Sequence, residues 1–236
     1  DTEQFRLLFL VLHQREGFHS TAQGGQRVFQ LMTDVGGKPF DGIDTCVQTF
    51  RHVAQGGGEM ADFVAPPGSA DYLGGFVVTA GIGAQELADA YLREHDDYSA
   101  IMLKALADRF AEAFAECMHE RVRKDLWGYA AHEKAGLEEL IAEKYQGIRP
   151  APGYPACPDH SVKKQMFELL QCNEIGMNLT SSLAMTPAAS VSGFYLSHPD
   201  SQYFNVGKVG EDQVQDLAKR QNLKVADIQR LLAPNL

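Results

Sequence analysis

Residues 97–127 read DYSAIMLKALADRFAEAFAECMHERVRKDLW, and this stretch decides the fold. Its large apolar side chains recur every three or four residues, which is the spacing of one face of a helix. Alanines are frequent between them and allow neighbouring elements to approach closely. The sequence therefore predicts one long helix, from Asp97 to about Trp127, at the centre of the core. Its apolar positions are Leu103, Leu106, Phe110, Phe114, Met118 and Val122.

The segments around this helix mix strand and helix patterns without regular alternation. Residues 71–79 and 188–196 are rich in residues that favour strands, and a turn at Thr186-Pro187 precedes the second of them. Because helices do not regularly separate the strands, we predict an α+β fold, a single domain with a twisted antiparallel sheet and long helices. Residues 61–66 are predicted as a short extended segment and residues 179–185 and 203–209 as further strands. The other predicted helices are residues 84–93, 162–170, 211–219 and 225–232.

The first part of the chain has the weakest pattern. Glycine-rich turns at Gly36-Gly37 and Gly56–Gly58 follow an apolar start at Phe5–Leu12. We therefore expect two regions, an N-terminal segment over residues 1–58 and a regular domain over residues 59–236.

Composition excludes several classes of partner. The chain has a formal net charge of −10 and a pI of about 5.2, whereas nucleic acids and anionic membranes select basic surfaces. The apolar run near the start is too short to cross a bilayer. The cysteines never form a C-x-x-C pair, so free thiols are expected. These features predict a cytoplasmic protein that binds neither nucleic acid nor membrane.

Two partial motifs resemble enzyme signatures but lack an essential part. Gly81-Ile82-Gly83 follows a predicted strand, yet the third glycine of a dinucleotide-binding loop would fall at Glu86. The stretch Ser190–Gly193 lacks the Gly-x-Ser-x-Gly nucleophile elbow. We therefore predict neither a Rossmann nucleotide site nor a hydrolase, and no catalytic side chain.

Glu116 and His119 have the spacing of a metal-ligand pair in carboxylate-bridged di-iron proteins. Such sites need a four-helix pattern, which this sequence does not have. The sequence therefore favours a solvated pair on the surface of the long helix and predicts no metal site.

Residues 147–160, GIRPAPGYPACPDH, hold four prolines around Arg149 and Tyr154. Proline fixes its own φ and restricts the residue before it, so this loop is stiff. Gly153 is the position where the loop can adopt positive φ or allow a ligand close to the backbone. Arg149 offers a planar set of donors suited to a carboxylate. The alternative is a structural loop whose arginine pairs with a nearby acid.

An ordered set of motifs across about residues 60 to 236 resembles the C-terminal activation domain of cobalamin-dependent methionine synthase. The motifs are ADFVAP (61–66), HDDY (95–98), KALADR (104–109), AEAFAE (111–116), HERVRK (119–124), the loop at 147–160, ASVSG (189–193), SHPDS (197–201) and LAPNL (232–236).

The resemblance implies a methyltransferase component of methionine biosynthesis that reductively reactivates the enzyme. S-adenosylmethionine would donate the methyl group to cobalamin bound by a partner module, and a flavodoxin or flavoprotein reductase would supply the electron. Arg121, Arg123 and Lys124 are candidate contacts for that reductase. The residues implied to bind S-adenosylmethionine are Arg149, Ala151, Gly153, Tyr154, Glu112, Tyr203 and Phe204.

Two other readings stay open at this point. Residues 1–58 match the family poorly and lack its usual Asp-Trp-Thr-Pro segment. The chain could then be a non-catalytic module that binds S-adenosylmethionine or docks on a corrinoid protein, or a structural remnant that binds nothing.

Overall fold

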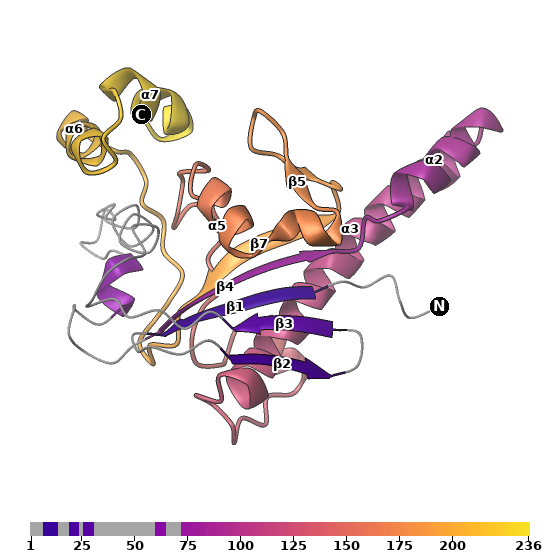
Figure 1. Cartoon of the computed structure of the whole chain (residues 1–236), viewed down its shortest axis with the longest axis horizontal. Coiled ribbons are helices and arrows are strands. Elements are labelled where there is room, and N and C mark those ends of the chain that lie inside the picture. The colour runs from indigo at the N-terminus through magenta and orange to yellow at the C-terminus, as the bar shows by residue number, and fades with distance from the viewer. Residues whose placement is uncertain (1–6, 14–18, 24–25, 31–59, 65–71) are drawn as a thin grey trace.

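The computed structural model describes residues 7–13, 19–23, 26–30, 60–64 and 72–236. A central antiparallel sheet has the long helix on one face and a shorter helix, α5, on the other (Figure 1). The predicted α+β class with an antiparallel sheet is therefore confirmed.

The central sheet has the strand order β1–β4–β7, with β1 at Leu7–His13, β4 at Tyr72–Thr79 and β7 at Ser190–Tyr195. β4 is the middle strand and is buried from Leu73 to Thr79, which explains its nearly continuous apolar sequence. The strands predicted at residues 71–79 and 188–196 are confirmed. β1 pairs with β4 along its full length, although it lies in the segment from which we predicted little structure.

Two smaller sheets complete the strands. β2 (His19–Gln23) and β3 (Gln26–Gln30) form an antiparallel pair beside β1 (Figure 1). β5 (Asn178–Leu179) and β6 (Met185–Thr186) pair over two residues each.

The long helix α3 covers Asp97–Arg121 and continues into a π-helical turn, η3, at Val122–Leu126. Its N-cap is Asp96, whose side chain accepts a hydrogen bond from the Ser99 N–H at 2.9 Å. The predicted helix is thus confirmed, but the predicted core face is wrong in its first half. Leu106 and Phe110 are 50% and 59% exposed. The buried positions of α3 before Met118 are alanines, which allow close approach (Ala100, Ala107, Ala111 and Ala115), and Ala115, Met118 and Val122 join the cluster against the sheet.

The two faces of the sheet carry different clusters because strand side chains alternate. Phe76, Val78 and Tyr195 face α3. Val77 and Phe194 point the other way and join a cluster beneath α5 (Lys163–Leu169) and the short 3-10 helix η4 (Cys172–Ile175).

The remaining helices lie at the ends of the molecule. α2 (Ala84–Arg93) packs along α3, and both project beyond the sheet (Figure 1). α6 (Glu211–Arg220), α7 (Val225–Leu231) and the short η5 (Ala233–Asn235) share a separate apolar cluster at the C-terminal end. These helices agree with the predictions, whereas α4 (Leu137–Ile141) was not predicted. Among the residues described, no helix combines the length and apolar character needed to cross a membrane.

Two predicted strands and one predicted extended segment are wrong. At the extended segment, Met60–Phe63 forms a 3-10 turn, η2, and residues 65–66 lie outside the described ranges. In the segment predicted as a strand at 179–185, only the ends pair, as parts of β5 and β6. Residues 203–209 form no strand, because their N–H groups bond to separate loops: Val206 donates to Pro155 O and Val209 to Asn235 O.

Gly193 is where β7, β4 and the proline-rich loop meet most closely. A Cβ there would lie 2.8 Å from Phe76 Cε1 and 2.9 Å from Pro150 O. We expect Gly193→Ala to lower the free energy of unfolding by about 1–3 kcal/mol through overpacking, measured by urea denaturation. Gly75→Ala is the matched control, since a Cβ on that sheet residue meets nothing within 4 Å. Equal stability of the two variants would contradict this packing.

Candidate functional site

A cavity of about 370 Å³ lies where the proline-rich loop leaves the edge of β7. β7 is the edge strand of the central sheet, so its outer side is free to form one wall. The loop forms a second wall, and side chains from α3, α5 and the segment around residue 203 complete the lining. The lining includes Phe76, Glu112, Glu143, Arg149, Ala151, Pro152, Tyr154, Lys163, Ser192, Tyr203 and Phe204.

The loop begins as a short continuation of the sheet. Ile148 exchanges both backbone hydrogen bonds with Leu196, and Phe194 N–H donates to Pro150 O at 2.9 Å. The chain then turns at Gly153, whose φ is +94° and whose N–H donates to Cys157 O. The positive φ predicted for Gly153 is confirmed. A Cβ there would lie 1.8 Å from the His160 ring, so no larger residue fits the turn.

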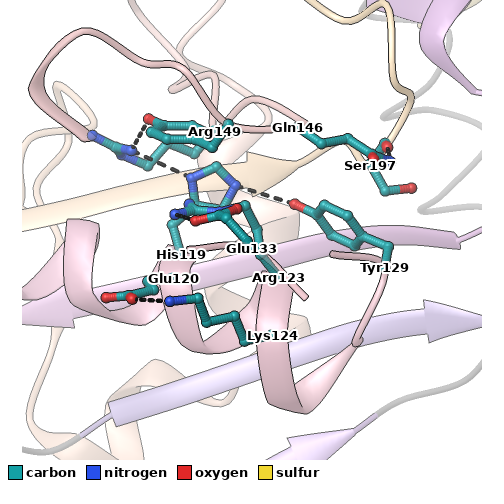
Figure 2. A network of polar contacts seen from close by, with 10 residues as sticks. His119, Glu120, Arg123, Lys124, Tyr129, Glu133, Gln146, Arg149 and Ser197 are labelled. Carbon is teal, nitrogen blue, oxygen red and sulfur yellow. Dashed lines mark hydrogen bonds and ion pairs between the residues drawn. The ribbon is translucent and has the colours of Figure 1, made fainter. Parts of the chain in front are cut away.

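Arg149 is held on several sides. Its Nη1 donates to the Tyr145 hydroxyl at 2.7 Å and to His119 Nδ1 at 3.3 Å (Figure 2). Its Nη2 lies 2.6 Å from Glu116 Oε2. Its backbone N–H donates to the Tyr203 hydroxyl at 3.0 Å. The arginine thus pairs with a nearby acid, which was the alternative for this loop. These contacts fix the orientation of the guanidinium before any ligand binds.

His119 must be neutral in this arrangement. A guanidinium can only donate, so Nδ1 of His119 accepts and its proton sits on Nε2, which lies 3.3 Å from the Tyr129 hydroxyl. Burial, followed by the charges of Arg123 and Arg149, holds the pKa of His119 well below its usual value. The predicted solvated pair is therefore wrong: His119 is fully buried, and Glu116 pairs with Arg149.

A second buried arginine lies behind this group. Arg123 donates from Nε and Nη2 to Glu133 at 2.7 and 2.9 Å, and its guanidinium lies 3.9 Å from the centre of the Tyr145 ring. Burial raises the pKa of Tyr145 to about 12, so its hydroxyl stays protonated. Arg123 is fully buried and cannot contact a reductase, so that prediction is wrong for Arg123. Lys124 pairs with Glu120.

The structure brings most of the predicted ligand-binding residues to one cavity. Gly153 alone does not line it and instead shapes the loop. Tyr154 is 61% exposed and therefore lies at the rim. The predicted residues in the lining are Glu112, Arg149, Ala151, Tyr154, Tyr203 and Phe204.

Sequence reasoning missed five polar residues of the lining, which are Glu143, His160, Lys163, Ser190 and Ser192. Glu143 follows α4 and has a φ of +53°, which is unusual for a residue with a side chain. Lys163 is 6% exposed, and its Nζ donates to Leu183 O at 3.3 Å. Burial lowers the pKa of Lys163. Ser192 lies on β7 and is also buried. No local sequence signal marks Lys163, because Lys164 and Gln165 follow it in the same helix turn.

In the described part of the chain, no group of three or more His, Cys, Asp or Glu residues is placed to hold a metal ion. Glu116 and His119 instead serve the Arg149 contacts described above.

The neutral state of His119 makes stability depend on pH. The pKa of His119 in the folded state lies below the ordinary value of 6.5. At a pH between the folded-state pKa and 6.5, the unfolded chain therefore binds more protons than the folded chain. The free energy of unfolding should therefore rise with pH through that window and level off above pH 6.5. His119→Asn removes this dependence. Urea denaturation at about pH 5 and about pH 7.5 should show a smaller difference between wild type and variant at the lower pH. The same difference at both values would contradict a neutral His119.

Two comparisons with known proteins agree. The family described as "Vitamin B12 dependent methionine synthase, activation domain" matches residues 46–222. A crystal structure of the MetH reactivation domain bound to AdoHcy is 59% identical in sequence, with a TM-score of 0.72. That match covers 75% of this chain and 55% of the other, so this chain spans little more than half the length of that domain. The chain belongs to the activation-domain family of vitamin B12-dependent methionine synthase.

Proposed function

We propose that the cavity beside β7 binds S-adenosylmethionine and that the chain acts in the reductive reactivation of cobalamin-dependent methionine synthase. The observation that carries the proposal is this cavity, lined by Arg149, Glu112 and Tyr203, in a chain of this family. The related crystal structure holds AdoHcy, which is S-adenosylmethionine without its transferred methyl group.

The charges of the lining suit this ligand. S-adenosylmethionine carries a sulfonium and an ammonium, which are cationic, and one carboxylate. Glu112 and Glu143 offer two carboxylates to the cationic groups. Arg149 has more N–H donors than its contacts with Tyr145, His119 and Glu116 use, so it can also donate to the ligand carboxylate.

The aromatic lining suits the adenosyl part. Phe76, Tyr154, Tyr203 and Phe204 supply apolar ring surface around the cavity. The Tyr203 ring is held in place because its hydroxyl accepts from the Arg149 N–H. Contacts between aromatic rings contribute about 0.5–1.5 kcal/mol beyond simple burial, so these rings favour a purine.

The chain's part in the reaction is placement. Cobalamin held by a partner module, once reduced by one electron, would supply the acceptor for the methyl group, and S-adenosylhomocysteine would be released. Transfer of a methyl group from a sulfonium moves no proton, so no acid or base is needed from the lining. Arg149 would hold the carboxylate of the ligand and Glu112 its cationic groups, so that the methyl group points out of the cavity, past Tyr154 at the rim. A flavodoxin or flavoprotein reductase is the proposed electron donor.

Arg149→Ala should lower the affinity for S-adenosylhomocysteine by at least about tenfold, because it removes a charge-assisted donor and leaves Glu116 unpaired. Arg149→Lys should also bind weakly, since lysine lacks the planar set of donors. Arg220→Ala is the control, because that residue forms an ion pair with Asp216 and does not line the cavity. Calorimetric titration measures all three, and wild-type affinity in Arg149→Ala would remove Arg149 from the site.

Reactivation itself is tested with the inactive, oxidised cobalamin enzyme from which the activation region has been removed. Adding this chain, S-adenosylmethionine and a flavodoxin reducing system should restore the absorbance spectrum of methylcobalamin, while Arg149→Ala should restore much less. If the chain binds S-adenosylmethionine but no methylcobalamin forms, a non-catalytic binding module becomes the better description.

A further inference from the structure

The edge of β7 at Ser192 is a buried polar site that no contact within the described residues fills. Ser192 lines the cavity and is 3% exposed. Its Oγ has no hydrogen-bond partner among the described residues. Buried hydroxyls in native proteins nearly always have a partner, so this one is explained by a group that enters the cavity.

The backbone of Ser192 faces the same side. Phe194 N–H donates to Pro150 O, so Phe194 directs its backbone groups away from β4 and towards the loop. In an antiparallel strand this direction alternates with each residue. Ser192, two residues earlier, therefore also directs its N–H and C=O away from β4, towards the outer edge of the sheet.

The loop cannot pair with Ser192, and its sequence shows why. Ile148 pairs with Leu196, and Pro150 bonds to Phe194. Continued by two residues, this register places Pro152 opposite Ser192. Proline has no N–H to donate to the Ser192 C=O, and Pro152 instead lines the cavity. Between the described loop and β7, the pairing ends at Phe194, which leaves a donor and an acceptor side by side on Ser192.

We propose that Ser192 recognises the purine base of the ligand and makes the site selective for adenine. The inference rests on the function proposed above. The Watson–Crick edge of adenine has a ring nitrogen that accepts next to an amino group that donates. The Ser192 N–H and C=O offer the complementary pair, and the hydroxyl can serve a further ring nitrogen.

The other polar end of the ligand finds charged partners elsewhere in the lining. The Ser192 C=O would repel its carboxylate, and its ammonium is better matched by the carboxylates of Glu112 and Glu143. Arg149 already provides donors for that end, in another part of the lining. The α5 helix and its cluster cover the neighbouring face of β7, so water competes poorly for these groups (Figure 1).

The test changes the base and leaves the backbone intact. S-inosylhomocysteine differs from S-adenosylhomocysteine at the base, where an N–H donor and a carbonyl acceptor replace the acceptor and the amino donor of adenine. The wild-type chain should bind the inosyl ligand at least about tenfold more weakly in calorimetric titration. Arg149→Ala should weaken both ligands by the same factor, because it acts at the other end.

The serine hydroxyl is tested separately. Ser192→Ala should bind S-adenosylhomocysteine about three- to tenfold more weakly. Ser182→Ala is the control, because Ser182 is exposed, does not line the cavity and bonds through its hydroxyl to Thr180. Its affinity should equal that of the wild type.

The outcomes separate this inference from the proposed function. Equal affinity of the wild type for the adenosyl and inosyl ligands would overturn recognition of the base by Ser192, while binding itself would still support the proposed function. An unchanged affinity in Ser192→Ala would overturn the part of the hydroxyl. Failure of the wild type to bind S-adenosylhomocysteine at all would overturn both proposals.

Discussion

The ion pair between Arg149 and Glu116 is the contact on which the site depends. It joins the proline-rich loop to the long helix, and the same arginine bonds to Tyr145 and His119, while its backbone bonds to Tyr203. Elements far apart in the sequence therefore converge on one guanidinium. Because the pair is partly buried, its loss would leave a carboxylate without its counter-ion, so the helix and loop are held in a single relative position.

The helix can make this contact because its inner face is small where it crosses the sheet. Ala115 lies against the strands, and one turn later His119 reaches the loop. The helix then widens into the π-helical turn, where Arg123 is fully buried against Glu133. Arg123 also packs on the ring of Tyr145, which accepts a hydrogen bond from Arg149. The buried ion pair of Arg123 therefore helps to position the residues that hold Arg149.

Much of the fold could be predicted because its periodic patterns are strong. The three-to-four spacing of the long helix and the strand-forming residues of β4 and β7 identify these elements. The spacing marked the wrong face in the first half of the helix, where Leu106 and Phe110 are exposed. Residues 203–209 looked like a strand, but their bonds go to distant loops, which no local pattern encodes. The prediction of a solvated His119 was wrong for the same reason, since a histidine on a helix is buried or exposed according to its tertiary neighbours. The cavity residues found by resemblance belong to compact motifs, whereas Glu143, Lys163 and Ser192 acquire their position only through folding.

The prolines of the loop also affect the tendency of the protein to aggregate. An edge strand with a run of unpaired backbone groups can template pairing with another chain, which leads to aggregation. Here the strand edge is covered by Ile148 and Pro150 as far as Phe194, and Pro152 lies beside the next open position. The free backbone groups of a single residue are too few to pair with a strand of another chain. The loop thereby leaves a polar position at the sheet edge open to a small molecule without exposing an edge strand that could aggregate.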